Sequence, residues 1–63
     1  MKLSIKAART NKGLTQNDLA KALNVTKKTV SAWENGKSVP KVDKVDALCA
    51  LLEVKYDDIR WRT

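Results

Sequence analysis

Basic and small side chains share one side of the helix predicted for residues 27–35: Lys27, Lys28, Ser31 and Ala32. At about 100° per residue these four fall within an arc of about 140°, whereas Val30 and Trp33 lie opposite and are expected to enter the core. Lysine ammonium groups could donate hydrogen bonds to guanine O6 and N7 or to phosphates, and small neighbours would allow close approach to a double helix. An ordinary solvated helix face with two lysines is the alternative interpretation.

A second short helix is predicted just before this one, over residues 16–23. Thr15 can cap it, and Asp18 three residues later completes a pattern similar to a capping box. Asn24 tolerates a positive φ and suits a turn, and Thr26 can cap the helix that follows. Two short helices joined by a tight turn form the layout of a helix-turn-helix element, which favours a binding role for the lysines.

Three further elements are predicted around this pair. Residues 3–12 contain no helix breaker, and Gly13 can end a helix there. Pro40 cannot lie inside a helix, but apolar residues recur after it at helical spacing. They are Val42, Val45, Leu48, Cys49 and Leu52. A last short turn is predicted around residues 56–60, with Ile59 turned inward.

Positive charge is concentrated in the first two-thirds of the chain. The net charge is +6, from 13 Lys and Arg against 7 Asp and Glu. Residues 1–42 hold nine basic and two acidic side chains, whereas residues 43–63 hold four basic and five acidic ones. This distribution is typical of a polyanion-binding protein, because lysines near phosphates release condensed counterions. A surface kept soluble by its net charge is the alternative.

Length and composition exclude several classes of function. A chain of 63 residues is expected to form one domain, residues 1–63, with a small core. It has no histidine, no glycine-rich phosphate loop and a single cysteine, Cys49. We therefore expect no enzyme activity, no metal, no cofactor, no small-molecule ligand and no disulfide. The sequence predicts neither a membrane span nor a signal peptide, so we expect a cytoplasmic protein.

Two segments, Gly13-Leu-Thr-Gln and Ser31-Ala-Trp-Glu-Asn-Gly-Lys, resemble the Cro/C1-type (XRE-like) helix-turn-helix transcriptional regulators of phages and bacteria. The resemblance runs from about Ile5 to Ile59. It implies an all-α, five-helix, lambda-repressor-like DNA-binding domain, with the helix-turn-helix at its second and third helices. It also implies that the second helix of the motif enters the DNA major groove.

The resemblance implies roles for particular residues as well. Base edges would be read by residues at the start and outer side of the third helix: Thr26, Lys27, Lys28, Ser31 and Ala32. Gln16 and Asn35 match positions that bind backbone phosphates, and Lys37 and Lys41 are expected to add phosphate contacts. The pair Arg9 and Glu34 matches a salt bridge between the first and third helices, which makes a structural role of the arginine more plausible than a phosphate contact.

The sequence departs from the family pattern at several helix ends. Asn24 stands where glycine is usual in the turn, and it is compatible with the same backbone. Glu53 ends the fourth helix where glycine or asparagine is usual, which predicts a strained or differently shaped cap. Lys41 and Lys55 stand at helix starts where small capping residues are common.

These features predict a sequence-specific regulator that binds double-stranded DNA, a Cro-like repressor that reads a roughly palindromic operator in the bacterial or phage-infected cell's nucleoid. A homodimer, at least on DNA, would present two reading helices about 34 Å apart. Leu51 and Trp61 are candidates for the dimer interface, although each could pack within its own chain instead. An antitoxin-type protein that binds a toxin as well as its operator is the alternative function.

Overall fold

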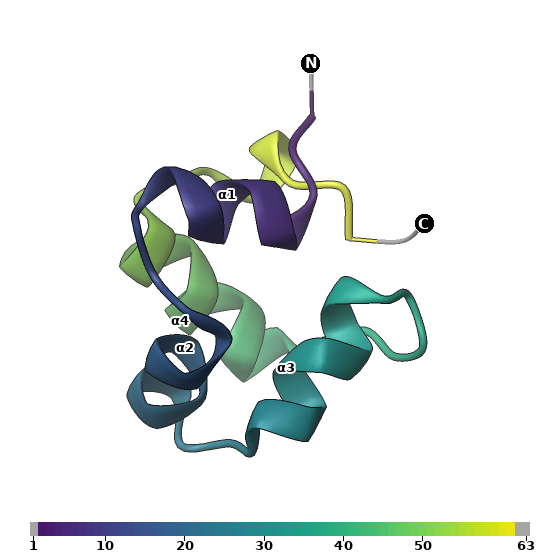
Figure 1. Ribbon diagram of the computed structural model, residues 1–63. Coiled ribbons are helices and arrows are strands. Elements are labelled where there is room, and N and C mark those ends of the chain that lie inside the picture. Colours follow the sequence, from purple (N-terminus) through teal and green to yellow (C-terminus); the bar gives the residue numbers. More distant parts are fainter. Residues whose placement is uncertain (1, 62–63) are drawn as a thin grey trace.

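Four α-helices and one turn of 3₁₀ helix make up the part of the chain that the structure, a computed structural model, describes: residues 2–61 (Figure 1). The elements are α1 (Ile5–Asn11), α2 (Gln16–Leu23), α3 (Lys27–Glu34), α4 (Val42–Leu52) and η1 (Tyr56–Asp58). In the view of Figure 1, α1 and the yellow η1 segment lie at the top and α2 lies at the bottom. Helix α4 packs against both α2 and η1 and so connects the two ends. No helix within residues 2–61 is long and apolar enough to cross a membrane.

Side-chain caps define where the first three helices begin. The Ser4 hydroxyl accepts a hydrogen bond from the Ala7 amide at 3.0 Å, and the Thr26 hydroxyl accepts one from the Thr29 amide at 3.2 Å. At Thr15 the predicted capping box is confirmed, with Asp18 as its partner. The first helix was predicted to span residues 3–12 but is shorter, because Ser4 has the extended backbone of a cap.

All four helices are followed by a residue in the left-handed region of φ, which closes the last turn. Asn24 has φ 57° and ψ 46°, so the turn predicted between α2 and α3 is confirmed. Gly13 and Gly36 have φ 71° and 74°. Glu53, for which a strained or differently shaped cap was predicted, has a φ of 57°, and this left-handed conformation is unfavourable for a residue with a side chain. Helix α3 ends one residue earlier than predicted, at Glu34.

The described part of the chain does not confirm the expected five-helix count. The fifth element is a single 3₁₀ turn, in which the Lys55 amide donates to the Asp58 carboxylate at 2.9 Å. Immediately afterwards Ile59 is extended, with φ −110°, and pairs with Leu3 in a parallel bridge. The turn ends at Asp58, and the Asp58 carbonyl and the Arg60 amide bond to Leu3 instead of extending it.

The core is formed by apolar side chains from the four α-helices and from Ile59, which follows η1. Its buried members are Ile5, Ala8, Leu19, Ala20, Leu23, Val30, Trp33, Leu48, Leu52 and Ile59. No polar or charged residue of the described part belongs to this core. The prediction that Trp33 belongs to the core is confirmed, since it is only 7% exposed. The indole is therefore placed for packing rather than for stacking on a nucleobase.

Replacement of Leu48 by alanine is expected to lower the free energy of unfolding by about 2–5 kcal/mol. Leu48 is 0% exposed, so the substitution leaves a cavity at the centre of the helices. Urea titration followed by circular dichroism measures the effect. Val42→Ala on the same helix is the control, because Val42 is 79% exposed and its truncation should change stability by less than about 0.5 kcal/mol. Equal losses in the two variants would contradict this assignment of the core.

The capping carboxylate of Asp18 should make stability depend on pH. Its pKa lies below the ordinary value of 3.8, mainly because the Thr15 amide donates to it, at 2.8 Å. The folded protein thus holds this proton less tightly than the unfolded chain. The resulting stabilisation is present at neutral pH and is lost as the pH falls below 3.8, through the lower folded value.

We therefore expect Asp18→Ala to melt below the wild type at pH 7 and the difference to shrink in strong acid. Thermal unfolding followed by circular dichroism between pH 7 and about pH 2 measures it. Asn17→Ala, one residue away, removes no titrating group, and its offset from the wild type should not vary with pH. A constant offset for Asp18→Ala would show that the carboxylate does not support the helix.

Candidate nucleic-acid interface

The structure brings the predicted base-reading residues together at the start and on the outer side of α3. Thr26, Lys27 and Lys28 are exposed, and Ser31 and Ala32 are half-buried. The opposite side of this eight-residue helix is buried through Val30, which is 0% exposed, and Trp33. The two faces of α3 are thus separated as the helical period requires.

The chemistry of this face is suited to the edges of base pairs. Lysine offers only hydrogen-bond donors, which match the O6 and N7 acceptors of guanine. The Ser31 hydroxyl accepts a hydrogen bond from the Asn35 amide group at 3.1 Å, so its own hydrogen remains available to an acceptor. The methyl group of Ala32 can contact a thymine methyl group without obstructing the approach of the backbone.

Sequence reasoning did not single out Thr29, which lies beside the predicted base-reading residues. Its hydroxyl is 2.9 Å from that of Thr26, and either oxygen can be the donor. The bond arranges two hydroxyl groups at the N-terminal end of α3. Their separation of three residues on a helix is the signal that could have identified the pair.

An ion pair joins α1 to α3 beneath this face. Arg9 Nε donates to Glu34 Oε2 at 2.7 Å, and Nη2 donates to Oε1 at 3.3 Å. The two side chains are 12% and 3% exposed. Arg9 Nη1 also donates a hydrogen bond to the Leu14 carbonyl at 2.8 Å, which fixes the segment just before α2. Because these guanidinium donors are directed into the protein, the arginine is placed as a structural residue.

The four predicted phosphate ligands lie at helix ends. Gln16 is the first residue of α2, and Asn35 is the residue that caps the end of α3. Lys37 follows that end, and Lys41 caps the start of α4 without a side-chain hydrogen bond. Asn35 and both lysines are exposed, whereas Gln16 is half-buried and donates through Nε2 to Glu34 Oε1 at 3.0 Å.

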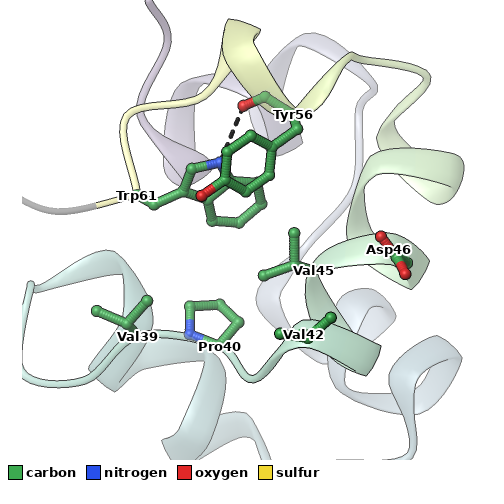
Figure 2. A pocket seen from close by; sticks show the side chains of 7 residues that line it. All are labelled: Val39, Pro40, Val42, Val45, Asp46, Tyr56 and Trp61. Carbon is green, nitrogen blue, oxygen red and sulfur yellow. Dashed lines mark hydrogen bonds between the residues drawn. The ribbon is translucent and has the colours of Figure 1, made fainter.

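An apolar groove lies on another part of the surface (Figure 2). It is lined by Val39, Pro40, Val42, Val45, Asp46, Tyr56 and Trp61. The two aromatic rings stack with centroids 5.5 Å apart, and the indole Nε1 donates to the Tyr56 carbonyl at 2.9 Å. Of the two predicted dimer contacts, Trp61 lies in this groove. The other, Leu51, lies outside it, and both residues are half-buried and pack against the core of their own chain.

Two further observations concern the metal-ligating and thiol side chains of the described residues. Within residues 2–61 no group of three histidine, cysteine, aspartate or glutamate residues could hold a metal ion. Cys49 is half-buried, and burial raises the pKa of its thiol above the usual value, which disfavours the reactive thiolate.

Known proteins share this sequence pattern. The chain matches the helix-turn-helix family over residues 5–59. Over 51 residues, 81% of the chain, it is 35% identical to the HTH-type transcriptional activator BcrR of Enterococcus faecalis. Over 37 residues, 59% of the chain, it is 49% identical to the 26 kDa repressor protein of Escherichia phage HK022. Over 56 residues, 89% of the chain, it is 32% identical to the antitoxin PezA of Streptococcus pneumoniae.

The matched segments cover 25%, 16% and 35% of the lengths of these three proteins, so all three are longer than the present chain. The match nevertheless includes all four α-helices and η1 of the present chain. The chain therefore belongs to the XRE-type helix-turn-helix family of DNA-binding transcriptional regulators.

Proposed function

We propose that the protein is a sequence-specific repressor that inserts α3 into the major groove of a roughly palindromic operator. The observation that carries this proposal is the outer face of α3, where two exposed lysines adjoin small side chains while Val30 and Trp33 hold the helix in the core. A helix held in this way can present its N-terminal residues to base edges without rotating.

Specificity and affinity are divided between two sets of residues. Those on α3 bias which bases are read, with Lys27 and Lys28 favouring guanine and Ala32 favouring thymine. Those at helix ends bind phosphates and set the register: Gln16, Asn35, Lys37 and Lys41. Bound across a promoter, such a protein blocks RNA polymerase. The phage repressor that is 49% identical over 37 residues supports this sign of regulation, whereas the activator BcrR represents the opposite sign.

An antitoxin-type role is a second candidate, and the relative named antitoxin PezA supports it. In this role the protein would bind a toxin as well as its operator. Co-expression with the product of an adjacent gene separates the candidates. Relief of growth inhibition by that product would favour the antitoxin role, and repression of a reporter without such relief would favour the simple repressor.

The apolar groove supports a homodimer as the DNA-bound form. Val42 is 79% exposed and Tyr56 is 59% exposed, and apolar surface of this kind is typical of contact sites. In a two-fold dimer the same apolar groove of a second copy would face this one, as a self-complementary contact requires. An interface of typical size covers about 800 Å² of each partner, which would be a large share of the 4374 Å² that this chain exposes. The small groove therefore supports a weak dimer that DNA reinforces.

Removing both α3 lysines should weaken binding to the cognate duplex by roughly 10- to 100-fold or more. The duplex is obtained by selection from a random library, and affinity is measured by fluorescence anisotropy over a range of salt concentrations. Lys27→Ala/Lys28→Ala should also lower the salt dependence, because fewer counterions are released. Lys55→Ala, an exposed lysine outside the face, is the control. Affinity that is independent of salt, or unchanged in the double variant, would refute the proposal.

Introducing a charge into the groove should abolish cooperative binding without harming the fold. Val42→Asp is suitable because the residue is exposed and begins α4, where a carboxylate suits the helix dipole. We expect weaker binding to a duplex with two half-sites and unchanged binding to a duplex with one. Ala47→Asp on the same helix, exposed but outside the groove, is the control. Equal affinity of the wild type and Val42→Asp for both duplexes would rule out this dimer surface.

A further inference from the structure

We propose that Glu34 is a positioning residue that orients the side-chain amide of Gln16 toward a DNA phosphate and ties that contact to α3. The inference rests on the proposed DNA-binding function and assigns the glutamate a role in addition to its ion pair with Arg9. The inference is based on two hydrogen bonds to the carboxylate of Glu34. Arg9 of α1 donates one of them, and Gln16, the first residue of α2, donates the other.

The hydrogen bond to Glu34 determines which way the amide of Gln16 faces. A side-chain amide has a donor end and an acceptor end, which a rotation of about 180° exchanges. The carboxylate of an ion pair has only acceptors, so Gln16 must turn Nε2 toward it, as the Nε2–Oε1 distance of 3.0 Å shows. One of the two hydrogens on Nε2 is used in this bond. The other remains free for a second acceptor.

The ion pair makes the carboxylate a stable reference point. Arg9 holds both oxygens of Glu34 and also bonds to the Leu14 carbonyl, two residues before Gln16. The glutamate side chain is only 3% exposed, so it has little freedom to move away. The guanidinium also offsets a negative charge that would otherwise repel a phosphate near Gln16.

This arrangement couples phosphate binding to base reading. Glu34 is the last residue of α3, whereas Gln16 is the first residue of α2. The bond between them therefore fixes a phosphate donor relative to the helix that would contact the bases. Without the carboxylate the amide could rotate and present Oε1, an acceptor that repels phosphate oxygens.

Single methylphosphonate substitutions in the selected duplex test the coupling, because each replaces one charged phosphate by a neutral group. We expect one position at which the substitution weakens wild-type binding by roughly ten-fold. At that position Gln16→Ala and Glu34→Gln should each lose most of this sensitivity. Circular dichroism confirms that the variants used are folded.

The double variant Gln16→Lys/Glu34→Gln separates orientation from structural damage. Lysine is a donor in every rotamer and needs no partner to orient it, so the sensitivity to the substituted phosphate should return in the double variant. Any general damage from Glu34→Gln would remain in it. If Glu34→Gln does not fold, Arg9→Leu/Glu34→Leu replaces the whole ion pair by apolar side chains of similar size, a change that is often tolerated.

Unchanged sensitivity in Glu34→Gln, or in the leucine pair where that is used, would show that the glutamate is only structural. Absence of any phosphate whose effect depends on Gln16 would overturn the inference too. Both results would occur in a protein that still binds its selected duplex through Lys27 and Lys28. Failure of the proposed function is distinct, because then no duplex would be selected at all.

Discussion

The burial of one face of α3 is the constraint on which the rest of the structure depends. Two helical turns are too short to be stable alone in water, so α3 exists because Val30 and Trp33 pack into the core. Rotation about its axis would expose the indole and bury the charged ammonium groups of Lys27 and Lys28, both of which are costly. The orientation of the outer face thus follows from the packing of the inner one.

Features encoded by neighbouring residues could be predicted from the sequence. The caps at Thr15 and Thr26 and the turn at Asn24 depend on bonds that span at most a few residues. The outer face of α3 was predictable for a related reason, since the helical period alone determines which side chains share a side. The outer face could be identified without knowing which residues pack against the inner one.

Features that join distant segments could not be predicted from the residues alone, and the Arg9–Glu34 ion pair was expected only through the family resemblance. The bond between Gln16 and Glu34 links positions 18 apart, and its geometry depends on how α2 packs against α3. The end of η1 was misplaced because Ile59 pairs with Leu3, at the other end of the described chain. The apolar groove escaped notice because its walls come from a loop, α4, η1 and the C-terminal segment, none of which is distinctive alone.

The pairing near the two ends of the described chain has a topological consequence. The Leu3 amide donates to the Asp58 carbonyl, and the Arg60 amide donates to the Leu3 carbonyl, each at 2.8 Å. These two bonds close nearly the whole polypeptide into a ring whose closure entropy grows only slowly with its length. Tension applied between residues 3 and 60 would act on these two hydrogen bonds before it reached α3. This junction would therefore be the first part of the domain to open under force.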